Sequence, residues 1–168
     1  MKRFLLLAVS LMVTLALAAQ KPRAELKLGS QMPQFTIESS VHGTIKSEDL
    51  KGKVVLINLF ATWCPPCQKE LAEVKSTLWP KYKDNKDFKM LVIGREHSDE
   101  ELASYNQKKG FECPLYHDKS SKVFSKFADQ SIPRSNLYNK DGKLIWSGLG
   151  YTPEEFKTLM NAIENALK

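Results

Sequence analysis

Apolar residues along this chain fall into short continuous runs and into stripes at helical spacing. The run Val54–Phe60 is almost entirely apolar and rich in branched residues, which is typical of a central strand covered on both faces. Residues 88–93 have the same character and predict a second central strand. Shorter strands are predicted at residues 32–37, 41–45, 113–116, 135–138 and 143–146. The last two strands form a hairpin across the turn at 139–142.

Helices are predicted between these strands. A helix over residues 65–83 carries an apolar stripe at helical spacing, made by Leu71, Val74, Leu78 and Tyr82. Pro80 lies inside it and is expected to kink the helix or end its first segment. Ser98 and Glu101 form a capping box before a helix that ends at Gly110. Further helical segments are predicted at 47–50, from 120 or 121 to 127, and from Pro153 to residue 168, the last capped by Thr152.

The order of these elements predicts one α/β domain over residues 28–168. Strands alternate with helices and a hairpin comes late, which indicates a central mixed sheet with helices on both faces. The chain shows no internal repeat, low-complexity segment or second domain.

The first 19 residues have the features of a secretory signal peptide. Lys2 and Arg3 precede an apolar run at 4–19 that ends in small residues, with cleavage expected after Ala18 or Ala19. A polar leader at 20–27 would follow. An uncleaved membrane anchor is the alternative, although the run is shorter than the roughly 20 residues that span a bilayer. We therefore expect an exported protein, periplasmic or otherwise extracytoplasmic, that is soluble once the signal peptide is removed.

The formal net charge of +6 comes from lysines spread over the whole chain. There is no basic run of five or six residues and little aromatic interleaving. A nucleic-acid partner is not expected, because phosphate binding requires a clustered basic face.

Two of the three cysteines lie three residues apart at a strand-to-helix junction. Pro65 suits the first helical position, so Cys64 lies at a helix N-terminus, where free N–H groups and the macrodipole favour the thiolate. Cys67, one turn further on, is close enough to form a disulfide with Cys64. Such a pair closes a very small loop and would stabilise little, so it indicates redox chemistry. Cys113 is left over, either as a small buried hydrophobe on a strand edge, as a third redox thiol or in an intermolecular bridge.

A strand followed by Trp-Cys-x-x-Cys at a helix start, with a late Ile132-Pro133 before a hairpin, resembles the thioredoxin fold. Residues 52–67 resemble the signature of its TlpA/ResA-like thiol-disulfide oxidoreductases almost position by position, and Met32-Pro33-Gln34-Phe35 and residues 139–143 also fit. The resemblance covers residues 28–168. It implies a thioredoxin-like fold with an N-terminal strand extension.

The resemblance implies roles for individual residues. Cys64 would be the nucleophile that forms a mixed disulfide, and Cys67 would resolve it. Trp63 would pack beside the pair, or is a plain core aromatic residue. Pro133 would be a cis-proline opposite the cysteines, and Ile132 would offer backbone groups to an extended substrate.

A buried carboxylate that accepts a proton is expected near the thiol pair. Cytoplasmic thioredoxins carry an aspartate six residues before the first cysteine, where this chain has Asn58. The resemblance points to Glu70 instead, on the same helix face as Cys64 and Cys67, where desolvation would raise its pKa and let it accept the proton of Cys67. The alternative is an exposed glutamate favoured by the helix dipole. After Pro133 the usual two threonines are replaced by Arg134 and Ser135, so Arg134 either biases the site toward acidic substrates, steadies the Cys64 thiolate or points into solvent.

Other functions of this superfamily fit the sequence less well. A peroxiredoxin needs proline and threonine seven and three residues before its cysteine, where Ile57 and Ala61 stand. Nothing in the sequence ties His42, His97 or His117 to the cysteines, which disfavours a copper-binding module. Structural zinc requires four ligands. Gln68 follows Cys67 where haem attachment requires histidine. We expect no metal and no cofactor.

The resemblance therefore implies an enzyme that reduces disulfides of exported proteins, apocytochrome c among them, and regains electrons from a membrane thiol donor. We expect it to be a monomer. A dithiol oxidase or isomerase of exported proteins is the alternative. The absence of histidine between the cysteines favours the reductase.

Overall fold

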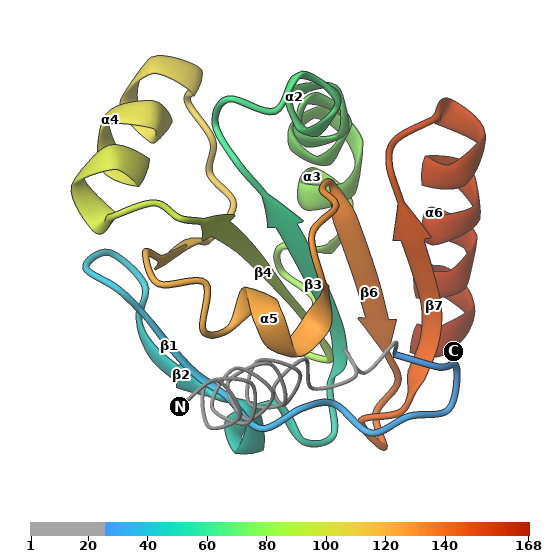
Figure 1. The fold of residues 1–168 in the computed structure, drawn as a ribbon. Helices are drawn as coiled ribbons and strands as arrows, with labels where there is room; N and C mark the ends of the chain where they lie inside the picture. Colours follow the sequence, from blue (N-terminus) through green and yellow to red (C-terminus); the bar gives the residue numbers. More distant parts are fainter. Residues whose placement is uncertain (1–25) are drawn as a thin grey trace, which may run out of the picture.

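The computed structural model describes residues 26–168, and the predicted signal peptide and all but two residues of the leader lie outside that range. The strands are β1 (Thr36–Ser39), β2 (Gly43–Lys46), β3 (Val54–Phe60), β4 (Phe88–Arg95), β5 (Leu115–Asp118), β6 (Arg134–Tyr138) and β7 (Leu144–Leu149). They form one sheet in the order β2-β1-β5-β4-β3-β6-β7 (Figure 1). Strands β3, β4 and β5 run parallel, and the remaining pairings are antiparallel. The predicted mixed sheet with an N-terminal strand extension is confirmed.

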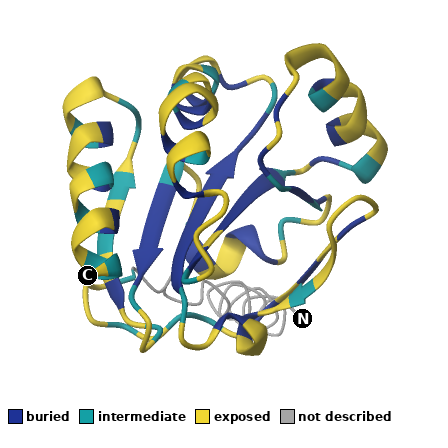
Figure 2. Ribbon diagram, turned by 180° about the vertical axis from the view of Figure 1, so that it is seen from behind, coloured by how far each residue is buried: buried dark blue, intermediate teal, exposed yellow. Residues whose placement is uncertain are grey.

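Helices cover both faces of this sheet. The α-helices are α2 (Pro65–Glu73), α3 (Trp79–Tyr82), α4 (Asp99–Lys109), α5 (Phe124–Phe127) and α6 (Pro153–Leu167), with a 3-10 turn η1 (Ser47–Leu50) and a π turn η2 (Val74–Leu78). Seen from behind, α2, α4 and α6 lie on one face with their outer sides exposed, and the central strands beneath them are buried (Figure 2). Short helix α5 and η1 pack on the other face.

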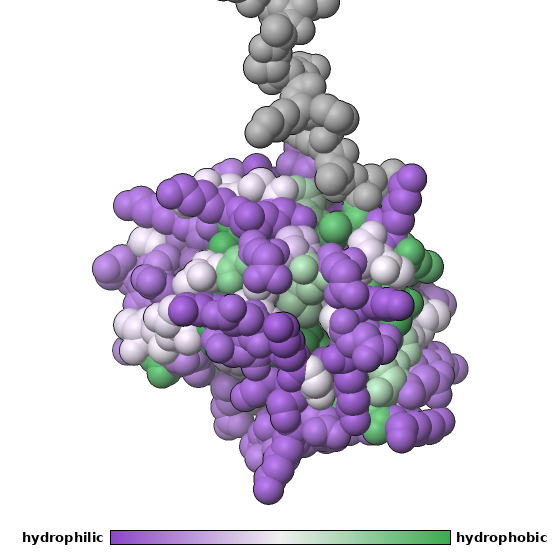
Figure 3. All heavy atoms as spheres, turned by 90° about the horizontal axis from the view of Figure 1, so that it is seen from below, coloured by the Kyte–Doolittle hydropathy of each residue, from purple (hydrophilic) through white to green (hydrophobic). Residues whose placement is uncertain are grey.

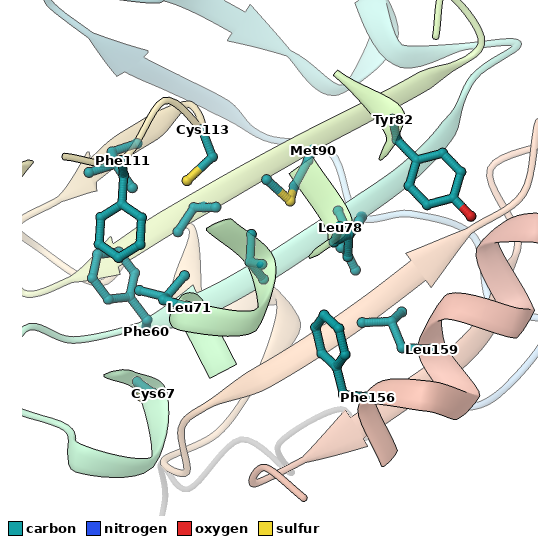
Figure 4. Close-up of a cluster of buried hydrophobic side chains, with 14 of the residues drawn as sticks. Phe60, Cys67, Leu71, Leu78, Tyr82, Met90, Phe111, Cys113, Phe156 and Leu159 are labelled. Carbon is teal, nitrogen blue, oxygen red and sulfur yellow. The ribbon is translucent and has the colours of Figure 1, made fainter. Parts of the chain in front are cut away.

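Strand β3 is buried at all seven positions, as its apolar run predicts. Side chains alternate between the faces of a strand, so Val54 and Leu56 pack under α2 and α6, whereas Val55 and Ile57 join the core beneath α5. The larger core also contains Leu71, Leu78 and Phe156 (Figure 4). Asn58 follows in the same alternation and therefore points toward α2, although it is polar and fully buried.

The effect expected of Pro80 is confirmed. The first α-helical segment ends at Glu73, and the π turn η2 follows before Pro80. Proline lacks the N–H that would continue the ladder, and its ring clashes with the carbonyl four residues earlier. In η2 the N–H of Trp79 bonds the carbonyl of Val74, five residues back, so the chain continues in a helical direction past Pro80.

Several boundaries differ from those predicted. Strand β1 begins at Thr36 instead of residue 32, because Pro33 has no N–H and the Phe35 N–H is taken by the Ser47 hydroxyl at 3.2 Å. Strand β5 begins after Pro114, which also has no N–H to donate, and Cys113 is therefore in the preceding loop. The capping box of Ser98 and Glu101 and the end of α4 at left-handed Gly110 are as predicted.

Helix α5 starts at Phe124, whereas residue 120 or 121 was expected, because of a buried carboxylate. Asp118, at the end of β5, accepts hydrogen bonds from the N–H groups of Val123 at 3.0 Å and Phe124 at 2.7 Å. These bonds satisfy two free donors at the start of the helix. Asp118 therefore joins the end of β5 to the helix that covers the second face of the sheet.

Replacing Asp118 with alanine should lower the free energy of unfolding by about 2 kcal/mol, because hydrogen bonds to a buried charged group are stronger than neutral ones. Urea unfolding followed by circular dichroism measures the change. Asp84→Ala removes an exposed carboxylate and should change stability by less than about 0.5 kcal/mol. Equal stability of the Asp118 variant and the unmodified protein would contradict this role.

Candidate active site

The two cysteines lie where β3 passes into α2, and they form a disulfide. The S–S distance is 2.06 Å and the Cα atoms are 5.3 Å apart. Cys64 is the N-cap residue of α2, with Pro65 at the first helical position as expected. Its sulfur accepts a hydrogen bond from the Cys67 N–H at 3.3 Å. The sulfur of Cys64 therefore lies against a free donor of the helix N-terminus, which is where a thiolate is stabilised.

The two cysteines differ slightly in exposure. Cys64 keeps 4% of its surface accessible, whereas Cys67 is fully buried. Trp63, the residue before them, is 62% exposed, so its interpretation as a core aromatic is wrong. Its packing against a substrate stays a prediction. The exposed ring beside the disulfide leaves an apolar surface that a partner chain can cover.

Glu70 is buried one helical turn after Cys67, and the alternative of an exposed glutamate is wrong. Only 4% of its surface is accessible. Its carboxylate accepts a hydrogen bond from the Asn58 amide at 3.0 Å and another from the Ser135 hydroxyl at 2.9 Å. The Asn58 amide also donates to the Ser135 oxygen at 2.8 Å. Three polar side chains, from β3, α2 and β6, thus form one closed network in the core.

The pKa of Glu70 is raised from 4.5 to about 7. Desolvation by burial is the largest cause, and the bonds from Asn58 and Ser135 act in the opposite direction because they favour the ionised form. The negative charge of Glu155 adds a small further increase. A carboxyl group with this pKa exchanges its proton at neutral pH, as a general acid or base must.

The peptide bond between Ile132 and Pro133 is cis, as expected from the resemblance. Pro133 directly precedes β6, whose first residue, Arg134, pairs with Leu59 near the end of β3. This pairing brings Pro133 to the same end of the sheet as the cysteine loop. The Pro133 carbonyl accepts a hydrogen bond from the Gly150 N–H at 2.9 Å. Arg134 is partly buried, and its buried Nε has no hydrogen-bond partner among residues 26–168.

Arg95 holds the segment that leads to Pro133, a role that the sequence did not indicate. Its guanidinium donates to the Gln130 carbonyl at 2.6 Å and lies 4.6 Å from the centre of the Phe124 ring. It also bonds Glu96 at 2.9 Å. The backbone two residues before Ile132 is thereby attached to the end of β4 and to α5.

Cys113 is not part of the site. Its side chain is 1% exposed, and Phe60 and Leu71 lie between it and Cys67 (Figure 4). Burial raises the pKa of its thiol to about 12. A thiol with this pKa stays protonated and inert, so Cys113 acts as the small buried hydrophobe of the sequence interpretation, in a loop and not on a strand edge.

The described part of the chain shows neither a metal cluster nor a membrane-spanning helix. Residues 26–168 contain no group of three or more histidine, cysteine or acidic side chains arranged to hold a metal ion. None of the helices within this range is long and apolar enough to cross a bilayer.

His97 contacts the cysteine loop through Thr62, a contact that the sequence did not reveal.

Comparisons with known proteins agree with this site. The family model described as "AhpC/TSA family" matches residues 28–147. The thiol-disulfide oxidoreductase ResA of Bacillus thuringiensis (strain Al Hakam) is 29% identical over 133 residues, which cover 79% of this chain and 76% of ResA.

Solved structures show the same likeness. A candidate protein disulfide isomerase from Bacteroides thetaiotaomicron superimposes with a TM-score of 0.80 at 32% identity, over 84% of this chain and 91% of the other. A candidate thiol:disulfide interchange protein DsbE from Chlorobium tepidum shares the fold, with a TM-score of 0.76 at 23% identity, over 86% of this chain and all of the other. The fold is thus thioredoxin-like, and the chain belongs to the AhpC/TSA family as one of its TlpA/ResA-like thiol-disulfide oxidoreductases.

Proposed function

We propose that this oxidoreductase is an exported dithiol reductase of protein disulfides, in which Cys64 attacks the substrate, Cys67 resolves the intermediate and Glu70 accepts the Cys67 proton. The observation that carries this proposal is the buried, hydrogen-bonded Glu70 with a pKa of about 7, one turn after Cys67. The signal peptide expected at residues 1–19 supports export. The domain would then comprise residues 28–168, after a leader at 20–27.

The proposed cycle starts from the reduced pair. The Cys64 thiolate attacks one sulfur of the substrate disulfide, and the other sulfur leaves as a thiolate that takes a proton from water. Glu70 then removes the proton of Cys67, and the Cys67 thiolate attacks the Cys64 sulfur of the mixed disulfide. This step releases the second substrate sulfur as a thiolate, which takes up the proton that Glu70 removed from Cys67, and leaves the Cys64–Cys67 disulfide seen in the structure. Two electrons from an external thiol donor, expected at the membrane, restore the dithiol.

The surroundings of the pair suit a polypeptide substrate. Ile132 lies before cis-Pro133, and its backbone would pair with an extended substrate segment. Exposed Trp63 directly precedes Cys64 in the chain and offers the substrate an apolar contact. Arg134, partly buried at the start of β6 next to Pro133, would favour an acidic group near the substrate cysteine. Cytochrome c precursors are one candidate substrate class, as the resemblance implies.

A dithiol oxidase or isomerase is the second candidate, and the likeness to the Bacteroides structure described as a candidate disulfide isomerase is the observation in its favour. The reduction potential of the Cys64–Cys67 pair distinguishes the two. A potential of about −120 mV with a strongly acidic Cys64 thiol is typical of oxidants and would overturn the reductase proposal. A peroxidase is less well supported, because Ile57 and Ala61 occupy the positions of the peroxidase proline and threonine.

Replacing Cys64 with serine should abolish reduction of insulin disulfides, because no nucleophile remains to form the mixed disulfide. Cys67→Ser should instead accumulate that mixed disulfide, which non-reducing electrophoresis detects. Cys113→Ser is the matched control and should keep full activity, since Cys113 is buried away from the pair. Activity retained by the Cys64 variant would rule out the mechanism.

Glu70→Gln should slow the resolution of the mixed disulfide about a hundredfold, the typical contribution of a general base. In the unmodified protein this rate should rise with pH through about 7, as Glu70 loses its proton, and the variant should lack that inflection. Stopped-flow measurement between pH 5 and 9 tests both expectations. An unchanged pH profile in Glu70→Gln would refute the proton-transfer role.

The raised pKa of Glu70 also implies that the stability of the folded protein depends on pH. Because the folded protein holds the Glu70 proton up to about pH 7 and the unfolded chain only to about pH 4.5, the folded state binds more protons between these values. The free energy of unfolding of the oxidised protein should therefore fall as pH rises through this range, by at most about 3 kcal/mol. Glu70→Gln should remove this decrease, whereas exposed Glu38→Gln should keep it. Urea unfolding at pH 4.5 and pH 8 measures the difference, and a decrease that persists in the Glu70 variant would assign it to other groups.

A further inference from the structure

The loop that carries the cysteines is held by a histidine from another part of the chain. The Thr62 N–H donates a hydrogen bond to Nε2 of His97 at 3.0 Å. His97 follows β4, lies directly before the cap of α4 and is 6% exposed. Its ring also lies 6.4 Å from the ring of Phe60, the last residue of β3. A buried imidazole thus binds the backbone two residues before Cys64.

The hydrogen bond from Thr62 indicates which nitrogen of the His97 ring carries the proton. Because Nε2 accepts an N–H, it carries no proton, and the proton of the neutral ring is on Nδ1. Nδ1 lies 3.5 Å from a carboxylate oxygen of Glu101. That same oxygen accepts the Ser98 N–H at 2.8 Å in the capping box of α4. The start of α4 therefore orients the ring so that Nε2 faces Thr62.

Tyr105 of α4 contacts the same peptide indirectly, through Gln68 of α2, which binds its carbonyl side. The Gln68 amide donates to the carbonyls of Ala61 at 3.4 Å and Thr62 at 3.3 Å. The Tyr105 hydroxyl donates to the Gln68 side-chain oxygen at 2.6 Å. Burial raises the pKa of Tyr105, so its hydroxyl keeps the proton that it donates.

These contacts depend on α4 and on the residue that precedes its cap. Glu101 and Tyr105 are four residues apart and lie on one face of α4, and His97 directly precedes the N-cap Ser98. Rings at both ends of this set contact Phe60, at 6.4 Å for His97 and 5.8 Å for Tyr105. The Ala61 carbonyl also accepts the Cys64 N–H at 3.2 Å, so the held peptide is bonded directly to the backbone of Cys64.

We propose that His97 and Tyr105 are positioning residues for the redox reaction, which hold the Ala61–Thr62 peptide so that the Cys64 sulfur stays at the N-terminus of α2. The stabilisation of a thiolate there depends on its distance and direction from the helix N–H groups. The donor concerned is the Cys67 N–H, which lies 3.3 Å from the Cys64 sulfur. A looser loop would leave Cys64 with a weaker donor, a higher thiol pKa and a slower attack. The inference rests on the proposed role of Cys64 as the reacting thiol.

The test compares four variants in the reduced, full-length protein. His97→Leu removes the acceptor, whereas His97→Gln keeps one, because the glutamine oxygen can take the place of Nε2. Tyr105→Phe deletes only the hydroxyl that orients Gln68. His117→Leu is the matched control, since His117 contacts Asp99 of α4 at 3.3 Å and, within residues 26–168, forms no hydrogen bond to the cysteine loop. Thermal unfolding of each variant records its stability.

The readout is the rate of alkylation by iodoacetamide as a function of pH, assigned to Cys64 by peptide mass spectrometry. His97→Leu should raise the Cys64 thiol pKa by about half a unit, which slows alkylation at pH 6 about threefold. Tyr105→Phe should shift it in the same direction, and both His97→Gln and His117→Leu should match the unmodified protein.

The proposal is overturned if folded His97→Leu and Tyr105→Phe leave the Cys64 thiol pKa unchanged, or if His97→Gln is as impaired as His97→Leu. Should His97→Leu fail to fold, Tyr105→Phe decides, because it keeps the buried ring. Alkylation does not require insulin reduction or a particular direction of electron flow. Failure of the reductase proposal would appear as retained insulin reduction in Cys64→Ser, and it is therefore distinguishable from failure of this one.

Discussion

The burial of strand β3 on both faces is the constraint on which the site depends. All seven of its residues are buried, so no position within the strand is open to a substrate, and the first accessible backbone lies just beyond its end. Helix α2 then packs back over the same strand through Leu71 and its neighbours, which leaves its N-terminus at the end of the sheet. Cys64 occupies that N-terminus, and its sulfur meets a free N–H of the first turn. Packing of an apolar core thus positions a polar reaction.

The same packing brings a carboxyl group into the core. Glu70 lies on the inner side of α2, and Asn58 and Ser135 supply donors from the two strands beneath it. The hydrogen bonds favour the carboxylate and burial disfavours it, and the net result is a pKa of about 7. A fully solvated glutamate would be ionised at this pH, and one buried without donors would be held more strongly neutral. The number of donors therefore sets a proton affinity suited to thiol exchange near neutral pH.

Polar contacts of the active-site loops are concentrated at one end of the sheet. Arg95 attaches the segment before Pro133, and α4 attaches the segment before Cys64. The opposite end, viewed from below, is covered largely by hydrophilic side chains (Figure 3). Lysines such as Lys53 and Lys140 pair there with Asp87 on the surface, at 4.0 and 2.9 Å. Such exposed pairs add little stability.

Local signals in the sequence were sufficient for most of the fold. The apolar run of β3 and the capping box at Ser98 each depend on neighbours in sequence, and each was predicted correctly. The cis-proline at Pro133 was implied by the family resemblance and is confirmed. Some boundaries failed at a proline, as at Pro114 before β5, and others failed where a side chain outside the element binds its backbone. Phe35 bonds the Ser47 hydroxyl, and Asp118 binds the N–H groups at the start of α5. No pattern within a single segment reports such a contact.

The sequence by itself determined the Cys-x-x-Cys pair at a helix start, because proline, helix and thiol spacing are all local. The family resemblance named Glu70 as a candidate, and helical periodicity places it on the face of the cysteines. Only the tertiary structure decided between a buried and an exposed carboxyl, because burial depends on how α2 lies on the sheet. It also revealed Asn58, Ser135, His97 and Arg95, whose bonds join residues 12 to 77 positions apart. Desolvation and long-range hydrogen bonds arise only when the chain is packed, and they are what set proton affinity at this site.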